Sequence, residues 1–387
     1  MERKKILIIG MFDSIHLARW LKQFENDNID FILFPSKKFK IINSELFKLV
    51  KSNKVAKFYL PWQYRFKAIA GYVDFFLSAL GNLININSRK IRLKSILSRV
   101  SFDLVHALEI QGAGYLYSEL PKTIINSNKL ILTNWGSDIY YYRNYLTHNK
   151  KIAKVVSLAA YYSAECQRDY DLLRNYKFTG KKLPCIPNSG GFTLKELNSY
   201  KKPSNQRKLL LCKGYGGLFG RVEIALPAIE SALRSHSEFN AFFYSVTNDI
   251  EPLIQKLILE FGSRVKYSTV RKPIDRGEIL KLFSEALVYI GCSTSDAIST
   301  SFLEALVYGA YPIQTNTSCA NEWVHRGAIC SVVSLDSRKI IIELNKITNS
   351  PKLMDKAQIN NFKVAHKFLS SEEIYKKAMT FYNLDEK

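Results

Sequence analysis

Short apolar runs alternate with longer amphipathic stretches along most of the chain, and this alternation constrains the fold more than any other feature. In the first half, strands are expected at residues 5–10, 30–35, 103–108, 129–135 and 183–188. In the second half, strands are expected at residues 208–214, 240–246, 265–270, 286–293, 311–316 and 328–335. Helices are expected between them, at residues 15–27, 161–175, 221–235, 249–261, 275–285 and 299–309. Strands that alternate with helices predict parallel sheets with helices on both faces.

The two series of strands predict two domains. A polar segment at residues 189–207, which contains Gly, Ser and Pro, separates the series and is interpreted as the linker. A chain of 387 residues is long enough for two ordinary cores. We therefore expect an N-terminal domain at residues 1–195 and a C-terminal domain at residues 205–370. Both are predicted to be doubly wound Rossmann-type α/β domains that face a central cleft, where ligands bind outside the carboxyl ends of the strands.

Composition and charge narrow the class of protein. Hydrophobic residues make up 47% of the chain, which indicates a globular protein, and the formal net charge of +22 predicts a polyanionic neighbour. The six cysteines form no Cys-x-x-Cys pair, so they are interpreted as reduced core residues of a cytosolic protein. The apolar run at the start is too short for a signal peptide, and we expect no bilayer-spanning segment. No His, Cys or Asp cluster has metal-ligand spacing, which predicts no required metal.

Two carboxylates mark the stretch "STSDAISTSFLEALVYGAYPIQTN" at residues 293–316. It follows an expected strand, and a helix is predicted to begin near Ser299, where free backbone N–H groups would attract phosphate. Asp296 lies in the loop before this helix and Glu304 lies inside it, so the two acids would reach hydroxyl groups on either side of a diphosphate. The alternative is a capping Asp and a solvated helical Glu.

A basic, glycine-rich segment lies at the start of the second series, in "LLLCKGYGGLFGRVEIALPAIE" at residues 209–230. Lys213 ends the expected strand, four glycines follow, and Arg221 stands at the next helix start. Lys and Arg on such a turn can clamp a diphosphate. The order of residues matches neither a P-loop nor the Gly-x-Gly-x-x-Gly fingerprint. The alternative is a flexible turn flanked by surface bases.

Together, these two segments resemble the C-terminal domain of retaining GT-B glycosyltransferases of family 4, in the branch that builds bacterial surface polysaccharides. The resemblance implies that Glu304 holds the ribose, that Asp296 contacts the transferred sugar, and that Lys213 and Arg221 neutralise the leaving diphosphate. The further donor-binding residues that it implies are Gly214, Ser299, Thr300 and Ser301. The sequence departs from the family by having Asp rather than Glu at 296, and Lys before Arg in the basic pair.

The first half carries the same resemblance, which covers most of residues 4–330 and is weakest at 36–101. "FDSIHLARWLKQF" resembles a turn of this family that would place Ser14 or His16 in the cleft. "FDLVHALEIQGAGYLY" and "LTNWGSDI" resemble two further segments, in which His106 matches the first of two histidines and is a catalytic candidate. Leu108 and Trp135 stand where the family has histidine. The polar residues that could replace those histidines in the cleft are Glu109, Gln111 and Asp138.

The resemblance implies transfer of a sugar, with retention, from a UDP-, GDP- or dTDP-sugar to a growing, lipid-linked bacterial glycan such as O-antigen, capsule or exopolysaccharide. It implies no cofactor and no metal. Asp169 and Asp171 resemble a metal-binding Asp-x-Asp pair, but they lie in a helical pattern and are expected to be exposed charges. The alternatives are a nucleotide-sugar epimerase or hydrolase of the same fold, and a basic nucleic-acid-binding protein.

Residues 36–101 hold fourteen Lys and Arg but only two acids, Glu45 and Asp74, and they are interleaved with aromatic residues. This pattern favours an anionic membrane surface. The alternatives are an ordinary basic face and single-stranded nucleic acid, which is not the expected partner. We therefore expect a cytoplasmic protein held at the inner face of the cell membrane. The resemblance further implies that the final helix, residues 371–387, packs back on the N-terminal domain.

Overall fold

The computed structural model describes residues 3–52, 55–59, 67–83, 87–194 and 202–384. The chain forms two compact units: the first runs to Gly190 and includes the residues from Ile374 onward, and the second is Gly191–Glu373. Within the predicted linker, residues 195–201 lie outside the described part of the chain. No helix in the described ranges has both the length and the apolar character needed to cross a bilayer.

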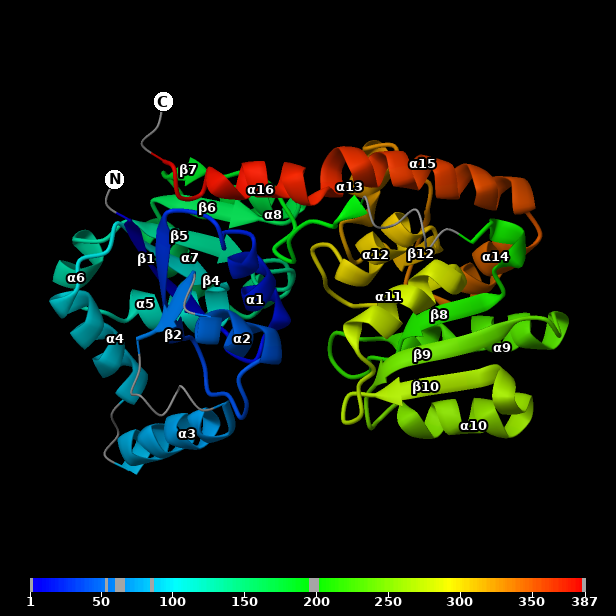
Figure 1. Cartoon of the computed structure of the whole chain (residues 1–387), viewed down its shortest axis with the longest axis horizontal. Coiled ribbons are helices and arrows are strands. Elements are labelled where there is room, and N and C mark those ends of the chain that lie inside the picture. Colours follow the sequence, from blue (N-terminus) through cyan, green and yellow to red (C-terminus); the bar gives the residue numbers. More distant parts are fainter. Residues whose placement is uncertain (1–2, 53–54, 60–66, 84–86, 195–201, 385–387) are drawn as a thin grey trace. The chain divides into compact units, whose positions relative to one another are not determined.

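The first unit is built on a parallel sheet in the order β3-β2-β1-β4-β5-β6-β7 (Figure 1). Its strands are β1 (Lys4–Gly10), β2 (Ile29–Pro35), β3 (Ala56–Phe58), β4 (Leu104–Leu108), β5 (Leu130–Asn134), β6 (Tyr161–Ala164) and β7 (Lys181–Lys182). Its helices are α1 (Ile15–Lys22), α2 (Ser44–Ser52), α3 (Lys67–Leu83), α4 (Ser88–Arg99), α5 (Tyr115–Ser118), α6 (Lys122–Asn126), α7 (Leu146–Leu158) and α8 (Gln167–Leu172).

Strand β1 shows why this sheet is buried on both faces. Ile6 and Ile8 pack into one hydrophobic core, whereas Leu7 and Ile9 pack into the other. Successive side chains of a strand point to opposite faces, so an uninterrupted apolar run fills both cores at once. This is the physical origin of the short apolar runs in the sequence.

The last part of the chain completes the core of the first unit. Helix α16 (Ser371–Met379) leads to Phe381 and Tyr382, both of which are buried in this core. Tyr382 accepts a hydrogen bond from the Trp20 indole N–H at 2.8 Å, and its ring packs against Phe24 and Phe31. Residues 385–387 of the predicted final helix lie outside the described part of the chain.

The second unit has a parallel sheet in the order β10-β9-β8-β11-β12-β13 (Figure 1). Its strands are β8 (Leu209–Lys213), β9 (Asn240–Val246), β10 (Val265–Thr269), β11 (Ala286–Gly291), β12 (Tyr311–Thr315) and β13 (Ser331–Val333). Its helices are α9 (Leu226–Ser235), α10 (Glu251–Phe261), α11 (Arg276–Glu285), α12 (Thr300–Tyr308), α13 (Ala320–His325), α14 (Ser337–Thr348) and α15 (Pro351–Leu369).

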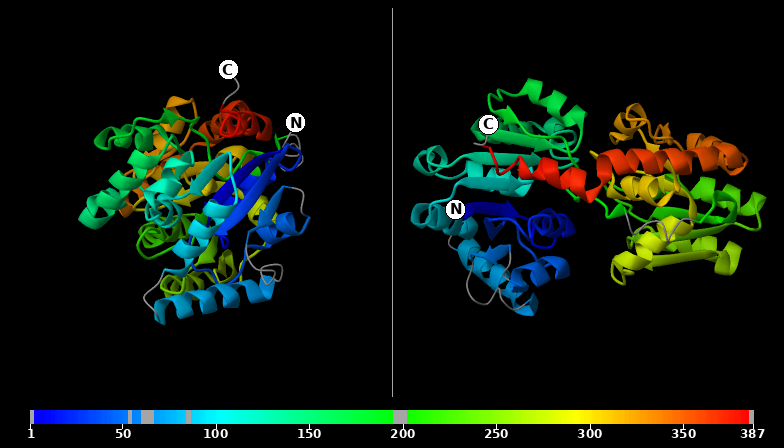
Figure 2. Two further views of the ribbon diagram at one scale, coloured as in Figure 1. Left: turned by 90° about the vertical axis from the view of Figure 1, so that its left-hand side faces the viewer. Right: turned by 45° about the horizontal axis from the view of Figure 1, so that its top comes forward.

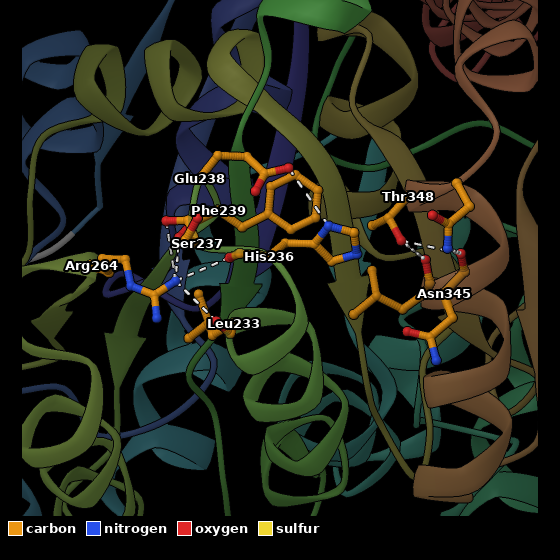
Figure 3. Close-up of polar contacts among 10 residues, drawn as sticks. Leu233, His236, Ser237, Glu238, Phe239, Arg264, Asn345 and Thr348 are labelled. Atoms are coloured by element: carbon orange, nitrogen blue, oxygen red, sulfur yellow. Dashed lines mark hydrogen bonds and ion pairs between the residues drawn. The ribbon is translucent and has the colours of Figure 1, made fainter.

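Arg264 closes the end of α9 (Figure 3). Its guanidinium donates to the carbonyl oxygens of Leu233 at 3.0 Å and His236 at 3.1 Å, where the helix leaves carbonyls without helical partners. In α14, the Thr348 hydroxyl donates to the Leu344 carbonyl at 3.0 Å. These contacts anchor helix ends and are structural.

The predicted fold class, two Rossmann-type α/β units with parallel sheets, is confirmed. Two element predictions are wrong. Residues 161–164, expected in a helix, form β6, because Tyr162 and Ser163 pair with β5 in the sheet. Residues 183–188, expected as a strand, follow β7 instead: Pro184 and Pro187 lack the N–H group that a sheet ladder needs.

Candidate active site

In both sheets, the strand order reverses at the first strand of the unit. In the first unit, β2 and β4 flank β1, and in the second unit β9 and β11 flank β8. Ligands of open parallel sheets bind outside the carboxyl ends of the strands at such a reversal. The candidate residues of each unit are therefore expected at these two places.

In the second unit, the glycine-rich loop after β8 is tied to the residues that follow β11. The Thr294 N–H donates to the Phe219 carbonyl at 3.0 Å, and the Thr294 hydroxyl donates to the Leu218 carbonyl at 2.6 Å. The Arg221 N–H lies 3.4 Å from the Cys292 carbonyl that accepts its hydrogen bond. These bonds bring the two sequence segments to the same edge of the sheet.

The glycines give this loop its shape. A Cβ atom at Gly220 would lie 2.3 Å from the Tyr215 carbonyl oxygen, and one at Gly214 would lie 2.8 Å from Cα of Val246. Gly217 has a φ of +73°, which favours glycine. The loop is therefore closely packed at both ends.

The two predicted cations stand at the two ends of this loop. The Lys213 ammonium group lies 4.1 Å from the ring centroid of Tyr215. The Arg221 Nε donates to Glu223 at 2.5 Å, and 37% of the Arg221 side chain is exposed. Two partly exposed cations at the ends of this glycine-rich loop can supply charge-assisted hydrogen bonds to an anion.

Helix α12 begins beside this loop. Its N-cap is Ser299, whose side chain makes no capping bond, and Thr300 is the first helical residue. The first backbone N–H groups of a helix have no helical acceptor and favour anions. Ser301 is fixed in the core, where its hydroxyl shares a hydrogen bond of 2.6 Å with that of Tyr244. Asp296 lies three residues before this N-cap, so the N-cap position itself is occupied by Ser299.

Glu304 is buried inside α12, with 2% of its surface exposed. It forms an ion pair with Arg276, the first residue of α11, whose side chain is one-third exposed. A buried carboxylate needs such a partner, because desolvation of an unpaired charge is costly. The alternative of a solvated surface charge is therefore wrong. Nothing in the sequence pattern identified Arg276 as its partner.

Two buried polar atoms at the same edge lack a hydrogen-bond partner among the described residues: Oγ of Ser293 and Oε1 of Gln314. Ser293 follows β11 closely and Gln314 lies near the end of β12. A Cβ atom at Gly291 would lie 2.1 Å from Oε1 of Gln314, so glycine at the end of β11 makes room for this side chain. A buried polar atom without a partner is costly, and it marks a place where a polar ligand atom would be stabilised.

In the first unit, Ser14 and His16 lie after β1. Ser14 is the N-cap of α1 and accepts the His16 N–H at 3.2 Å. The His16 ring meets Trp135 edge to face, with the ring centroids 5.6 Å apart. Trp135 follows β5, so the residue that replaces a family histidine lies beside the histidine after β1.

Glu109 and Asp138 are buried beside each other at the ends of β4 and β5. Glu109 has a φ of +115°, and its carboxylate accepts the N–H groups of Gly112 and Ala113 at 2.6 and 2.7 Å. Asp138 accepts the N–H groups of Ile110 at 2.8 Å and of Trp135 at 2.9 Å. Burial, and then the nearby Glu109, raise the pKa of Asp138 well above its usual range. Both acids thus hold the loops that follow these strands.

Gln111 lies in the same loop, where its Nε2 donates to the Asp138 carbonyl at 2.9 Å. Leu108, which occupies the second histidine position of the family, is buried at the end of β4. At the end of β4, the polar groups therefore come from the loop that follows and not from the strand itself.

His106 lies in the middle of β4 and has no exposed surface. Its Nδ1 is 2.8 Å from the Tyr382 hydroxyl and its Nε2 is 2.7 Å from the Thr133 hydroxyl. Burial lowers the pKa of His106 from 6.5 to about 3, so the ring is neutral at physiological pH. In this position His106 links the sheet to the end of the chain and presents no atom to a ligand.

Asp169 and Asp171 both lie in α8, as the sequence predicts, but they differ in exposure. Asp171 is exposed and pairs with Arg174 at 3.3 Å. Asp169 is fully buried, pairs with Arg168 at 2.8 Å and accepts the Asn134 amide at 2.7 Å. The expectation of exposed charge is therefore wrong for Asp169, whose role in this network is structural.

Comparisons with known proteins show which family and which solved structures this chain resembles. Residues 78–164 match the family described as glycosyl transferase 4-like. HepE from Anabaena, solved in complex with UDP-glucose, aligns with a TM-score of 0.67 and 13% identity over 98% of this chain and 99% of that one. Its fold is GT-B. A glycosyltransferase from Rickettsia africae aligns with a TM-score of 0.67 and 14% identity over 100% of both chains.

A second GT-B relative is a sucrose-phosphate synthase from Thermosynechococcus elongatus, with a TM-score of 0.68 and 13% identity over 99% of both chains. Because the identities are this low, the structural matches establish the GT-B fold and leave substrates open. A search of curated protein sequences found no match.

Proposed function

We propose that this GT-B protein transfers a sugar from a nucleotide diphosphate sugar to an acceptor glycan. The observation that carries the proposal is the tie between the basic glycine-rich loop and the loop before α12, made by Thr294 and Arg221. These hydrogen bonds bring the cations close to the loop that leads into α12, where the strand order of the second unit reverses. The match to HepE, solved with UDP-glucose, supports a nucleotide sugar as the ligand.

The diphosphate would lie between the glycine-rich loop and the start of α12. Lys213 and Arg221 would neutralise it, and the N–H groups at the start of α12 would bind its oxygens. The Gly214 N–H, a candidate from the sequence, instead donates to the Tyr244 carbonyl at 2.8 Å. Glu304, fixed by Arg276, would accept the ribose hydroxyls. The donor is a UDP-, GDP- or dTDP-sugar.

The mechanism that fits these groups retains the anomeric configuration. As the bond from the sugar to the diphosphate breaks, negative charge grows on the leaving oxygen, and preorganised cations stabilise that charge most in the transition state. The freed phosphate oxygen then takes the proton of the acceptor hydroxyl, which attacks on the same face. Asp296 would contact the sugar as it moves. Lys213 and Arg221 would stabilise the negative charge of the leaving diphosphate, as a bound metal ion does in other enzymes. The proposed reaction therefore needs neither metal nor cofactor.

The acceptor would bind at the corresponding edge of the first unit. His16, Trp135 and Gln111 lie after β1, β5 and β4, where an acceptor sugar would meet aromatic and amide groups. Glu109 and Asp138 hold the backbone of these loops in place. We infer a lipid-linked bacterial glycan as acceptor, because the basic residues between 36 and 101 would draw the protein to the anionic inner face of the cell membrane.

Acceptor-dependent release of nucleotide tests the proposal. Mass spectrometry of nucleotide sugars that co-purify with the protein identifies the donor, and that donor is then incubated with and without a glycolipid extract. Nucleotide release that requires the extract, with a product that keeps the anomeric configuration, supports a retaining transferase. Release without acceptor indicates a hydrolase, and conversion of the sugar without release indicates an epimerase. Salt-sensitive oligonucleotide binding unaffected by Glu304→Gln would favour the nucleic-acid alternative.

A further inference from the structure

Helix α3 exposes large apolar side chains and buries a charged one, which is the reverse of the usual pattern for a helix of a globular protein. Its exposed side chains include five large apolar residues, with exposed fractions from 46% for Leu80 to 78% for Tyr72. The five are Ile69, Tyr72, Phe75, Phe76 and Leu80. At 3.6 residues per turn they occupy about 140° of the helix circumference, so they form one continuous stripe. A contiguous exposed apolar surface of this kind marks an interaction site.

The buried face of α3 packs Ala70 into the core and also carries fixed polar groups. Asp74 is fully buried and accepts hydrogen bonds from Arg89 at 2.8 Å and Arg92 at 3.4 Å, both on α4. Ser78, also buried, accepts from Arg89 at 3.0 Å. Rotating the helix to hide its apolar stripe would break this network and leave a charge unpaired, which is costly. The polar side of α3 is thus satisfied inside the unit and its apolar side is presented outward.

Close backbone packing holds the helix in the same orientation. A Cβ atom at Gly71 would lie 1.7 Å from the carbonyl oxygen of Lys40, so the segment before α2 presses directly on α3. Ile41, the next residue, is 60% exposed and adds to the apolar surface. In the views of Figures 1 and 2, α3 lies at the margin of the first unit, away from its sheet.

The charge of the chain segments that precede and follow α3 indicates the kind of partner. Exposed bases lie on the segments next to it in the chain: Lys37, Lys38, Lys40, Lys48, Lys51, Lys57, Lys94 and Arg99. Lys54 and Arg65, of the same basic stretch, lie outside the described residues. The stretch has only two acids, and one of them, Asp74, is neutralised by the arginines of α4. A partner must therefore accept an apolar stripe and carry negative charge around it.

We propose that α3 lies in the plane of an anionic phospholipid bilayer, with its apolar stripe inserted between the lipid headgroups and the surrounding bases on the headgroup phosphates. Such a bilayer offers both an apolar layer and anionic headgroups. A second copy of this chain would bring the same positive charge against itself. Nucleic acid would satisfy the bases but would leave aliphatic Ile69 and Leu80 without an apolar partner. The inference deepens the membrane location on which the proposed acceptor rests, and it does not depend on the identity of the donor.

Vesicle sedimentation of the full chain tests the proposal. Vesicles of phosphatidylcholine alone are compared with vesicles that contain one-third phosphatidylglycerol. The double variant Phe75→Ser/Phe76→Ser should bind anionic vesicles about tenfold or more weakly, because burial of an aromatic side chain contributes about that factor or more. The matched control is Leu146→Ser/Leu259→Ser, which removes apolar residues that are 69% and 88% exposed elsewhere. The control should bind as the unsubstituted protein does.

Two further measurements separate lipid insertion from other occupants. Tryptophan placed by Phe76→Trp should be quenched by lipids that carry a nitroxide on the acyl chain, and this quenching should persist in high salt. Turnover of a water-soluble acceptor should be unchanged in Phe75→Ser/Phe76→Ser, which keeps this proposal separate from the proposed function. Equal loss of vesicle binding in the control, absence of quenching, or a dimer that Phe75→Ser/Phe76→Ser dissociates would each overturn the proposal.

Discussion

Acid should destabilise the first unit through His106, because the hydrogen bonds around this residue favour the neutral imidazole. The Trp20 indole can only donate, and it donates to the Tyr382 oxygen. The Tyr382 hydroxyl is thereby directed to donate to Nδ1 of His106, whose Nε2–H then donates to Thr133. A protonated imidazole would present a second donor to Tyr382, so the chain accommodates only the neutral ring.

The magnitude follows from the pKa, which burial lowers from 6.5 to about 3. Because the unfolded state binds the proton more readily, folding stability falls as the pH drops below 6.5 and continues to fall until about pH 3. The slope is about 1.4 kcal/mol per pH unit, which gives about 3 kcal/mol by pH 4. The stability is fully present above the unfolded pKa.

The assay is urea unfolding at pH 7, 6, 5 and 4, with the protein compared with His106→Gln, which cannot titrate. Contributions of other groups are common to both proteins and cancel in the difference. The unsubstituted protein should lose about 3 kcal/mol more than the variant between pH 7 and pH 4. His325→Gln, which removes an exposed histidine, should follow the unsubstituted protein. Parallel stability curves for His106→Gln and the unsubstituted protein would refute the reasoning.

Three predictions concern the proposed reaction. Lys213→Ala or Arg221→Ala should cost about 2–4 kcal/mol of transition-state stabilisation, and near-normal turnover of either variant would remove these cations from the mechanism. Glu304→Gln keeps an oxygen for Arg276 and should mainly raise the donor KM, whereas Asp296→Asn should mainly lower kcat. Steady-state kinetics and calorimetric titration of nucleotide check this pair, and normal binding and turnover in both would contradict it. Activity should survive excess EDTA, and loss that Mn²⁺ or Mg²⁺ restores would show that a metal takes part.

The sequence predicts the parallel sheets because their strands are buried on both faces and therefore read as apolar runs. It fails where tertiary pairing outweighs the local pattern. Tyr161–Ala164 has helical neighbours but pairs with β5 along the sheet, and Pro184 interrupts the ladder that the apolar run at residues 183–188 predicts. Strand pairing is set by partners distant in the chain, which no local window contains.

The candidate site of the second unit is more predictable than that of the first. Glycines, cations and a helix start lie in order along the chain there, so spacing identifies the segments. The partner of Glu304 is not predictable in this way, because Arg276 stands 28 residues earlier on another helix. His106 also illustrates the limit: one residue pattern is compatible with a ligand-facing histidine and with a buried one, and only the position of Tyr382 decides between them.

The insertion of Tyr382 into the first unit has a consequence for biosynthesis. The residues that complete this core are translated after the whole of the second unit. During synthesis, the first unit emerges with the cavity beside Trp20 and His106 still open, and the second unit can finish folding before it. The order of completion is therefore the reverse of the order of translation. A ribosome that stops before Phe381 releases a chain whose first unit lacks these core residues, and such an exposed core is a substrate for chaperones and proteases.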